Sequence, residues 1–268
     1  HHSLHVLLTG ESQSYYADYA RDPHALLARG LAEGFVYQGE VSRYLGGPRG
    51  ESSVHLPPSA FVNFLQNHDQ VGNRAGGERL TTLVRDEAAL AAAAAVLLLA
   101  PAPPLLFMGE EWAALEPFPW FCDFEAELAA RVHAHRSREY PGSPDPAAPA
   151  TFACARLDWR VLGQGAHARA LAFHRRLLEI RRAEIAPRIL ELHAGRFTRA
   201  NAGRAFAVSW EGAGERLRLI ANLGAEAAAA PESAPGRVIF ATHPQLPAPL
   251  SREQLAPWSV TWLLEPAP

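Results

Sequence analysis

The sequence predicts an α/β fold followed by a small antiparallel β domain, on three observations. Two short apolar runs, Phe61–Leu65 and Leu105–Met108, flank a helical segment that Asp86 can cap and that extends to Ala100. This strand–helix–strand order is typical of a parallel sheet. Both runs end in polar residues, at the position where the active sites of α/β proteins lie. After about Arg188 the spacing of the apolar residues changes from 3.6 to two, which favours antiparallel strands.

The first part of the chain predicts helices and one long loop. Residues 4–31 carry apolar residues at helical spacing, and Asp22 followed by Pro23 is a favourable helix start. Gly34 is expected to end this helix, because glycine readily adopts the left-handed conformation of a helix C-terminus. Residues 39–58 are rich in glycine, proline, serine and arginine, which predicts a long loop that is either functional or disordered.

The β domain is expected in residues 187–268, after an α/β part in residues 1–186. An amphipathic helix around residues 170–182 precedes the boundary, and Pro187 marks its end. Short β-prone runs with glycine and proline between them then follow. These runs are Ala205–Trp210, Arg216–Leu223, Arg237–Ala241 and Trp258–Leu264.

Composition excludes several classes of function. The 268 residues are 48% hydrophobic with a formal net charge of −3, so no basic surface is expected for nucleic acid or an acidic membrane. The longest apolar run, Ala88–Ala100, is too short to span a bilayer. Two cysteines, Cys122 and Cys154, do not make a disulfide framework, and no signal peptide is visible. We therefore expect a cytoplasmic protein that binds neither nucleic acid nor membrane.

The polar residues after the first run, Gln66 to Gln70, form the first candidate site. Here Asp69 stands beside His68, with the amides of Asn67 and its neighbours. A carboxylate, an imidazole and amides together suit the hydroxyl groups of a sugar. The alternative is a capping cluster that satisfies the backbone of the loop.

The second candidate cluster is Glu110–Trp112, after the second run. Adjacent side chains point in different directions, so only one of its two acids is expected to face a site. The alternative is a surface acid beside an acid that is the buried partner of an arginine. The aromatic stretch Pro117–Asp123 suits stacking on sugar rings, and its alternative role is a hydrophobic plug that holds the loop down. A metal trio of His1, His2 and His5 is disfavoured, since no carboxylate or thiol completes the set.

These motifs together resemble one family. Phe61–Arg74 resembles the seventh-strand motif of the α-amylase superfamily, glycoside hydrolase family 13, and its extension Gly77–Leu80 resembles in particular the malto-oligosyltrehalose trehalohydrolases. Pro104–Trp112 resembles the eighth-strand motif of that group, and Pro117–Asp123 resembles its following aromatic loop. The opening, His1–Glu11, resembles the segment after the sixth strand.

The resemblance implies the C-terminal part of a (β/α)8 barrel followed by the antiparallel domain. It also implies a retaining glycosidase, in which one carboxylate is the nucleophile, a second is the acid/base, and a third stabilises the transition state. Asp69 corresponds to the third acid, with His68 on the same sugar. The reaction implied is hydrolysis of the α-1,4 bond between a malto-oligosaccharide and a terminal trehalose. The ligand is malto-oligosyltrehalose or a related α-glucan, with no metal or organic cofactor. Further substrate contacts are expected at Asn67, Arg74, Glu110, Trp112, Phe118, Trp120 and Asp123.

The chain departs from the family pattern in one important respect. The nucleophile and the acid/base lie on the fourth and fifth strands of the family, whereas this chain opens after the sixth and without an initiator methionine. We therefore expect a C-terminal fragment that carries one catalytic carboxylate of three and is inactive alone. Phe124 stands where a histidine is expected. Two alternatives stay open: a sibling enzyme, such as a branching enzyme or a malto-oligosaccharide hydrolase, and a non-catalytic carbohydrate-binding remnant.

Overall fold

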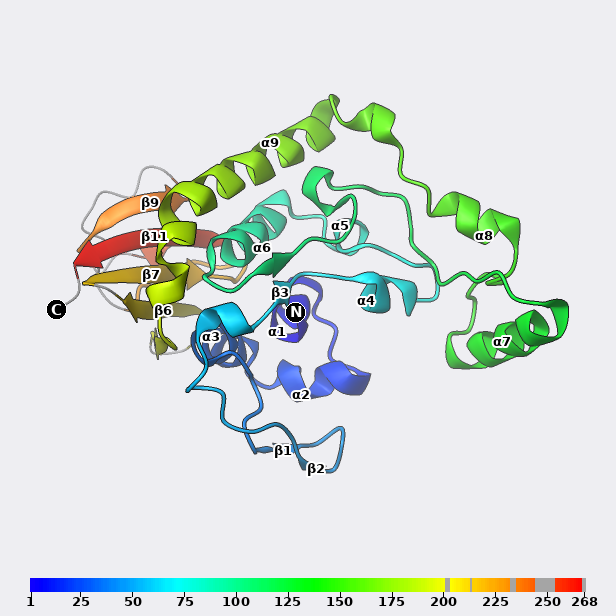
Figure 1. Cartoon of the computed structure of the whole chain (residues 1–268), viewed down its shortest axis with the longest axis horizontal. Coiled ribbons are helices and arrows are strands. Elements are labelled where there is room, and N and C mark those ends of the chain that lie inside the picture. The colour runs from blue at the N-terminus through cyan, green and yellow to red at the C-terminus, as the bar shows by residue number, and fades with distance from the viewer. Residues whose placement is uncertain (201–202, 213, 232–234, 244–253, 267–268) are drawn as a thin grey trace. The chain divides into compact units, whose positions relative to one another are not determined.

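The computed structural model describes residues 1–200, 203–212, 214–231, 235–243 and 254–266 (Figure 1). Parts of the predicted β domain, residues 201–202, 213, 232–234, 244–253 and 267–268, lie outside the described residues. The chain divides into two compact units. The first comprises His1–Asn63, Asp86–Pro104 and Arg176–Pro268, and the second comprises Phe64–Arg85 and Leu105–Arg175. The expected boundary at residue 187 stays a prediction.

The first unit contains an antiparallel sheet, as the period-two pattern predicts. Its strand order is β5 (Arg196–Arg199), β6 (Ala205–Gly212), β7 (Glu215–Asn222), β11 (Ser259–Pro266) and β9 (Arg237–Ala241) (Figure 1). Each neighbouring pair is antiparallel. The sequence pattern predicts four of these strands and misses β5. A separate short pair joins β8 (Ala228–Ala229) to β10 (Gln254–Leu255).

Two tryptophans anchor one face of this sheet. Trp210 and Trp262 are fully buried and stack with ring centres 5.7 Å apart. The Trp210 indole N–H donates to the carbonyl of Leu31, and the Trp262 N–H donates to that of Ala95, each at 3.2 Å. Both rings thus fill the core and also fasten helices to the sheet, as expected of amphipathic aromatic residues in a core.

Helices α1 (His2–Thr9), α2 (Ala17–Ala20), α3 (Pro23–Glu33) and α6 (Glu87–Leu99) belong to the first unit, with 3-10 turns η1 (Ser14–Tyr16) and η2 (Pro58–Ala60). The predicted helix starts are confirmed. Asp22 accepts from the Ala25 N–H at 3.2 Å, and Asp86 caps α6 in the same way. Gly34 ends α3 at φ 94°, and a Cβ there would lie 2.1 Å from the Phe61 ring, so only glycine fits.

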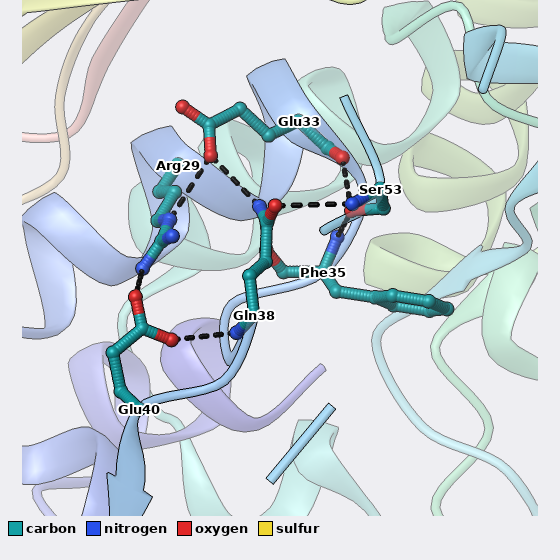
Figure 2. Close-up of polar contacts among 6 residues, drawn as sticks. All are labelled: Arg29, Glu33, Phe35, Gln38, Glu40 and Ser53. Atoms are coloured by element: carbon teal, nitrogen blue, oxygen red, sulfur yellow. Dashed lines mark hydrogen bonds and ion pairs between the residues drawn. The ribbon is translucent and has the colours of Figure 1, made fainter. Parts of the chain in front are cut away.

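The long loop after α3 is ordered by polar contacts (Figure 2). A carboxylate oxygen of Glu33 accepts from Arg29 at 3.0 Å and from the Gln38 amide at 2.8 Å. The Ser53 hydroxyl donates to the Glu33 carbonyl at 2.6 Å and accepts from the Phe35 N–H at 3.2 Å. The loop therefore returns to the helix from which it left.

The tip of this loop is a hairpin of β1 (Val41–Ser42) and β2 (Gly47–Pro48). Buried Asp18 holds it, since its carboxylate accepts from the Ser42 hydroxyl and from the Arg43 N–H. Burial raises the pKa of Asp18. The hydrogen bonds to its charged form, together with the positive charge of Arg49, outweigh burial and lower the pKa below its ordinary value.

Strands β3 (Asn63–Phe64) and β4 (Pro104–Leu105) pair with each other but are shorter than the apolar runs predict. The Asn63 N–H donates to the Pro103 carbonyl at 3.0 Å. Pro103 and Pro104 themselves have no N–H to offer a neighbouring strand, which limits the ladder.

The second unit is built from helices and turns: α4 (His68–Gly72), α5 (Leu80–Leu83), η3 (Glu110–Trp112), α7 (Ala126–Glu139), α8 (Pro149–Cys154), η4 (Trp159–Val161) and the first part of α9 (Gly165–Ile180). The sequence predicts α9, whose last turns belong to the first unit and are followed by a π turn (Arg181–Ile185) and a 3-10 turn (Ala186–Glu191). Among the described residues, none of the helices has both the length and the apolar character needed to cross a membrane.

Candidate active site

The turn that carries Asp69 lies in the second unit and is held by Asn67. The Asn67 side-chain oxygen accepts from the Asp69 N–H at 2.8 Å and from the Gln70 N–H at 3.4 Å, which caps α4. His68 and Asp69 follow the cap and are exposed, with 72% and 64% of their side-chain surface in solvent. The His68 Nε2 lies 3.4 Å from the Asp69 carboxylate. Asn67 thus has a capping role, while His68 and Asp69 together face solvent.

Two further polar residues of the same segment serve the backbone. The buried Gln66 side chain accepts from the Leu80 N–H at 2.9 Å. The fully buried Arg79 donates to the carbonyls of Glu116 and Met108 and lies over the Phe107 ring, 4.9 Å from its centre. Arg79 therefore fixes the chain on both sides of η3.

Arg136 of α7 holds the other end of α4. Its guanidinium donates to the Gly72 carbonyl at 2.9 Å and to the side-chain oxygen of Asn73 at 3.0 Å. The same group lies 5.3 Å from the ring centre of Trp120 and 4.5 Å from that of Tyr140. Sequence reasoning missed Arg136, because no local signal marks a contact across 63 residues. In the sequence, nothing distinguishes Arg136 from an arginine on a solvent-exposed helix face.

Glu110 and Trp112 lie in the interior of the second unit. The Glu110 carboxyl accepts from the Phe107 N–H at 3.4 Å, and burial raises the pKa of Glu110 to about 8. Trp112 is 2% exposed, and its ring centre lies 4.8 Å from that of the exposed Trp159. Glu111, in contrast, is only partly buried. One acid of the pair is therefore buried and the other reaches the surface, and the role of either toward a sugar stays a prediction.

The aromatic stretch is partly buried. The Phe118 N–H donates to the Gly77 carbonyl at 2.8 Å, and the Phe118 ring meets that of Phe107 edge to face at 5.2 Å. Gly77 has φ 68°, and a Cβ there would lie 2.1 Å from the backbone nitrogen of Pro119, so the close approach requires glycine. These contacts hold the aromatic stretch against Gly77 and Phe107.

Comparison with known proteins finds clear relatives. The chain is 38% identical over 251 residues to the malto-oligosyltrehalose trehalohydrolase of Deinococcus radiodurans, covering 87% of this chain and 40% of that protein. It is 40% identical over 195 residues to the protein of that name from Rhizobium sp. (strain M-11), covering 68% and 32%. The chain belongs to the α-amylase superfamily, glycoside hydrolase family 13. It spans about a third to two fifths of the length of these curated relatives.

A solved structure from Salmonella typhimurium, described as a candidate alpha amylase, agrees with this membership. It has a TM-score of 0.90 and 41% identity, and the match covers 98% of this chain and 45% of that one. A protein-family model described as a domain of unknown function, DUF3459, matches residues 193–262. The predicted fold class, the C-terminal part of a (β/α)8 barrel followed by a small antiparallel β domain, is confirmed.

The remaining predicted site residues of this superfamily member differ in exposure. Arg74 is half-buried, with its Nε 3.5 Å from the Glu78 carboxylate. Trp120 is half-buried against Arg136, and Asp123 is exposed. The structure thus joins Asn67, His68 and Asp69 on one capped turn. The roles of all these residues toward a sugar stay predictions. Within the described part of the chain, no cluster of three or more His, Cys, Asp or Glu residues could hold a metal ion.

Proposed function

We propose that this chain forms part of a retaining α-glycosidase that hydrolyses the α-1,4 bond between a malto-oligosaccharide and a terminal trehalose, and so releases trehalose. The observation that carries this proposal is the exposed pair of His68 and Asp69 on a turn capped by Asn67. Two proteins named for this activity share 38% and 40% identity with the chain.

Asp69 has the chemistry that the third carboxylate of such a site requires. Its exposed oxygens can accept hydrogen bonds from neighbouring sugar hydroxyls. Hydrogen bonds that strengthen as the sugar ring distorts toward an oxocarbenium ion lower the barrier, whereas bonds of equal strength in the ground state do not. His68 is within reach of the same sugar and would donate or accept a second hydrogen bond. The Asn67 cap keeps the turn from rearranging when a ligand binds.

Bond cleavage itself needs two more carboxylates in this mechanism. No other acid of the chain matches the family's nucleophile or acid/base motif, so we assign those groups to residues outside the sequence printed here. Each contributes orders of magnitude to the rate. We therefore propose that the chain alone does not release trehalose. We further propose that the enzyme acts in the cytoplasm and that it needs no metal or organic cofactor.

A chimera tests the proposal and separates it from its alternatives. In the chimera, this chain replaces the matching part of the Deinococcus radiodurans relative, and the intact relative is the positive control. We expect trehalose release from a trehalose-capped malto-oligosaccharide and little cleavage of an ordinary malto-oligosaccharide of equal length. Faster cleavage of the ordinary chain would favour a sibling enzyme. A folded chimera that binds the capped sugar without cleaving it would favour a binding remnant, and trehalose release by the isolated chain would overturn the assignment of the missing acids.

A further inference from the structure

The turn that carries Asp69 is too short to be stable by itself. Helix α4 has five residues, and an isolated helix of that length does not form in water. Its first N–H groups are satisfied by Asn67, as described above. Its last carbonyl, that of Gly72, accepts from Arg136, which lies on a different helix. The orientation of the turn therefore depends on a side chain from outside it.

A continuous set of hydrogen bonds links Arg136 to Asp69. Arg136 donates to the Asn73 side-chain oxygen at 3.0 Å, and the Asn73 N–H donates to the Asp69 carbonyl at 3.0 Å. Moving the guanidinium would release Asn73, and with it the last hydrogen bond that closes the turn at Asp69. A positive charge at the C-terminal end of a helix is also favourable for its dipole.

Arg136 is itself held tightly. It is 9% exposed, and the rings of Trp120 and Tyr140 pack against its guanidinium. The hydrogen-bond acceptors that the structure gives it are neutral, one carbonyl and one amide oxygen. Burying a guanidinium among neutral acceptors is costly, and the two rings offset part of that cost. Because Trp120 is one of the expected sugar contacts, Arg136 connects two parts of the candidate site.

We propose that Arg136 is a positioning residue that fixes the orientation of Asp69 relative to the substrate. The proposal rests on the proposed function of Asp69. Arg136 does not touch the sugar; it sets the geometry of the turn whose carboxylate does. Lysine cannot replace it, because an ammonium group lacks the planar fork that serves Gly72 and Asn73 together.

The first test uses the chain as it stands. Hydrogen exchange of the peptide over residues 66–74 is compared in the parent chain, R136A, R136K and the control R138K. Arg138 is exposed, and its guanidinium donates to the Ala134 carbonyl of its own helix. We expect R136A and R136K to accelerate exchange in that peptide at least about 10-fold and to leave the peptide over residues 87–99 unchanged. Unchanged exchange at residues 66–74 would overturn the positioning role.

The second test measures kcat and KM for trehalose release by the chimera. We expect R136A and R136K to lower kcat by about 10-fold to 100-fold with little change in KM, because a displaced carboxylate loses mainly its transition-state contacts. Added guanidinium should restore part of the kcat of R136A. In a D69N background the Arg136 substitutions should have no further effect on kcat. A loss of equal size in both backgrounds would mean a general structural role and would overturn the proposal. A D69N variant with full activity would instead overturn the proposed function.

Discussion

The two units of this chain differ in what their buried polar and charged side chains bind. In the sheet of the first unit, whose core is mainly apolar around Trp210 and Trp262, the buried Arg218 donates to the buried Glu265 of the neighbouring strand at 3.1 Å. The second unit buries Gln66, Arg79, Glu110 and Arg136, all of them polar or charged. Gln66 and Arg79 bond to backbone groups of turns, and Arg136 does the same at α4.

This difference follows from the backbone. Strands of a sheet satisfy one another's N–H and C=O groups, so their side chains are left to pack. Turns leave some of their N–H and C=O groups without a backbone partner, and those that are buried need a side chain or an ordered water as partner. In the second unit, buried polar side chains therefore support loops, whereas His68 and Asp69 lie in solvent and are available to a ligand.

Substitution of Arg79 should break the second unit most severely. Arg79→Met keeps the volume but leaves the carbonyls of Glu116 and Met108 without their donor. Each buried carbonyl left without its donor costs about 1–3 kcal/mol, so we expect a loss of about 2–6 kcal/mol in the free energy of unfolding, measured with urea. Arg175→Met, at an exposed arginine of the same unit, is the matched control and should change stability by less than about 0.5 kcal/mol. Equal losses in the two variants would contradict this account.

The buried Glu110 should make the stability of the second unit depend on pH. Burial raises the pKa of Glu110 to about 8 in the folded chain, against 4.5 for an ordinary glutamate. Between these values the folded chain holds a proton that the unfolded chain has released, so stability is full below pH 4.5 and falls as the pH rises through about 8. Each unit of difference between the folded and unfolded pKa of Glu110 corresponds to at most about 1.4 kcal/mol in the free energy of unfolding.

Glu110→Gln should therefore unfold at the same urea concentration as the parent at pH 5 and be more stable than it by a few kcal/mol, on the order of 1.4 kcal/mol per pKa unit, at pH 9. Glu111→Gln, at the adjacent and less buried acid, is the control. A parent chain whose stability does not fall between pH 5 and pH 9 would show that the Glu110 carboxyl ionises normally.

Trp262 provides the corresponding test in the first unit, with a smaller effect. Trp262→Phe keeps a buried ring but loses the N–H that bonds to the Ala95 carbonyl. We expect a cost of about 1–2 kcal/mol in the free energy of unfolding, because one hydrogen bond to a buried carbonyl is lost. Trp210→Phe should behave alike. If Trp262→Phe lowered the free energy of unfolding more than Arg79→Met does, the expected difference between the two units would be contradicted.

Sequence reasoning recovers the parts of the fold that local chemistry determines. The period-two pattern predicts β6, β7, β9 and β11, and the caps at Asp22 and Asp86 set helix starts within a residue. It overestimates β3 and β4, because an apolar run does not reveal where a ladder ends. The contacts of Arg79 and Arg136 join segments 29 to 64 residues apart, and no local pattern encodes them.

The candidate site likewise has one part that the local sequence predicts and one part that depends on contacts between distant segments. The pattern of Asn67, His68 and Asp69 is local, and the structure brings these residues together on one turn. Whether Glu110 or Glu111 is buried depends on how η3 packs, so the sequence leaves both possibilities open. The burial of Trp112 beneath Trp159 likewise needs a fold to be seen.

The most direct test of the central claim is the kcat/KM of trehalose release by the chimera with Asp69→Asn, beside Glu127→Gln at an exposed acid of α7. Asparagine keeps the shape of the side chain and removes its charge, so folding should be unaffected. If Asp69 is the acid that this chain supplies to the reaction, kcat/KM falls by at least about 100-fold in the first variant and is unchanged in the second. A loss smaller than about 10-fold at Asp69 would contradict the account.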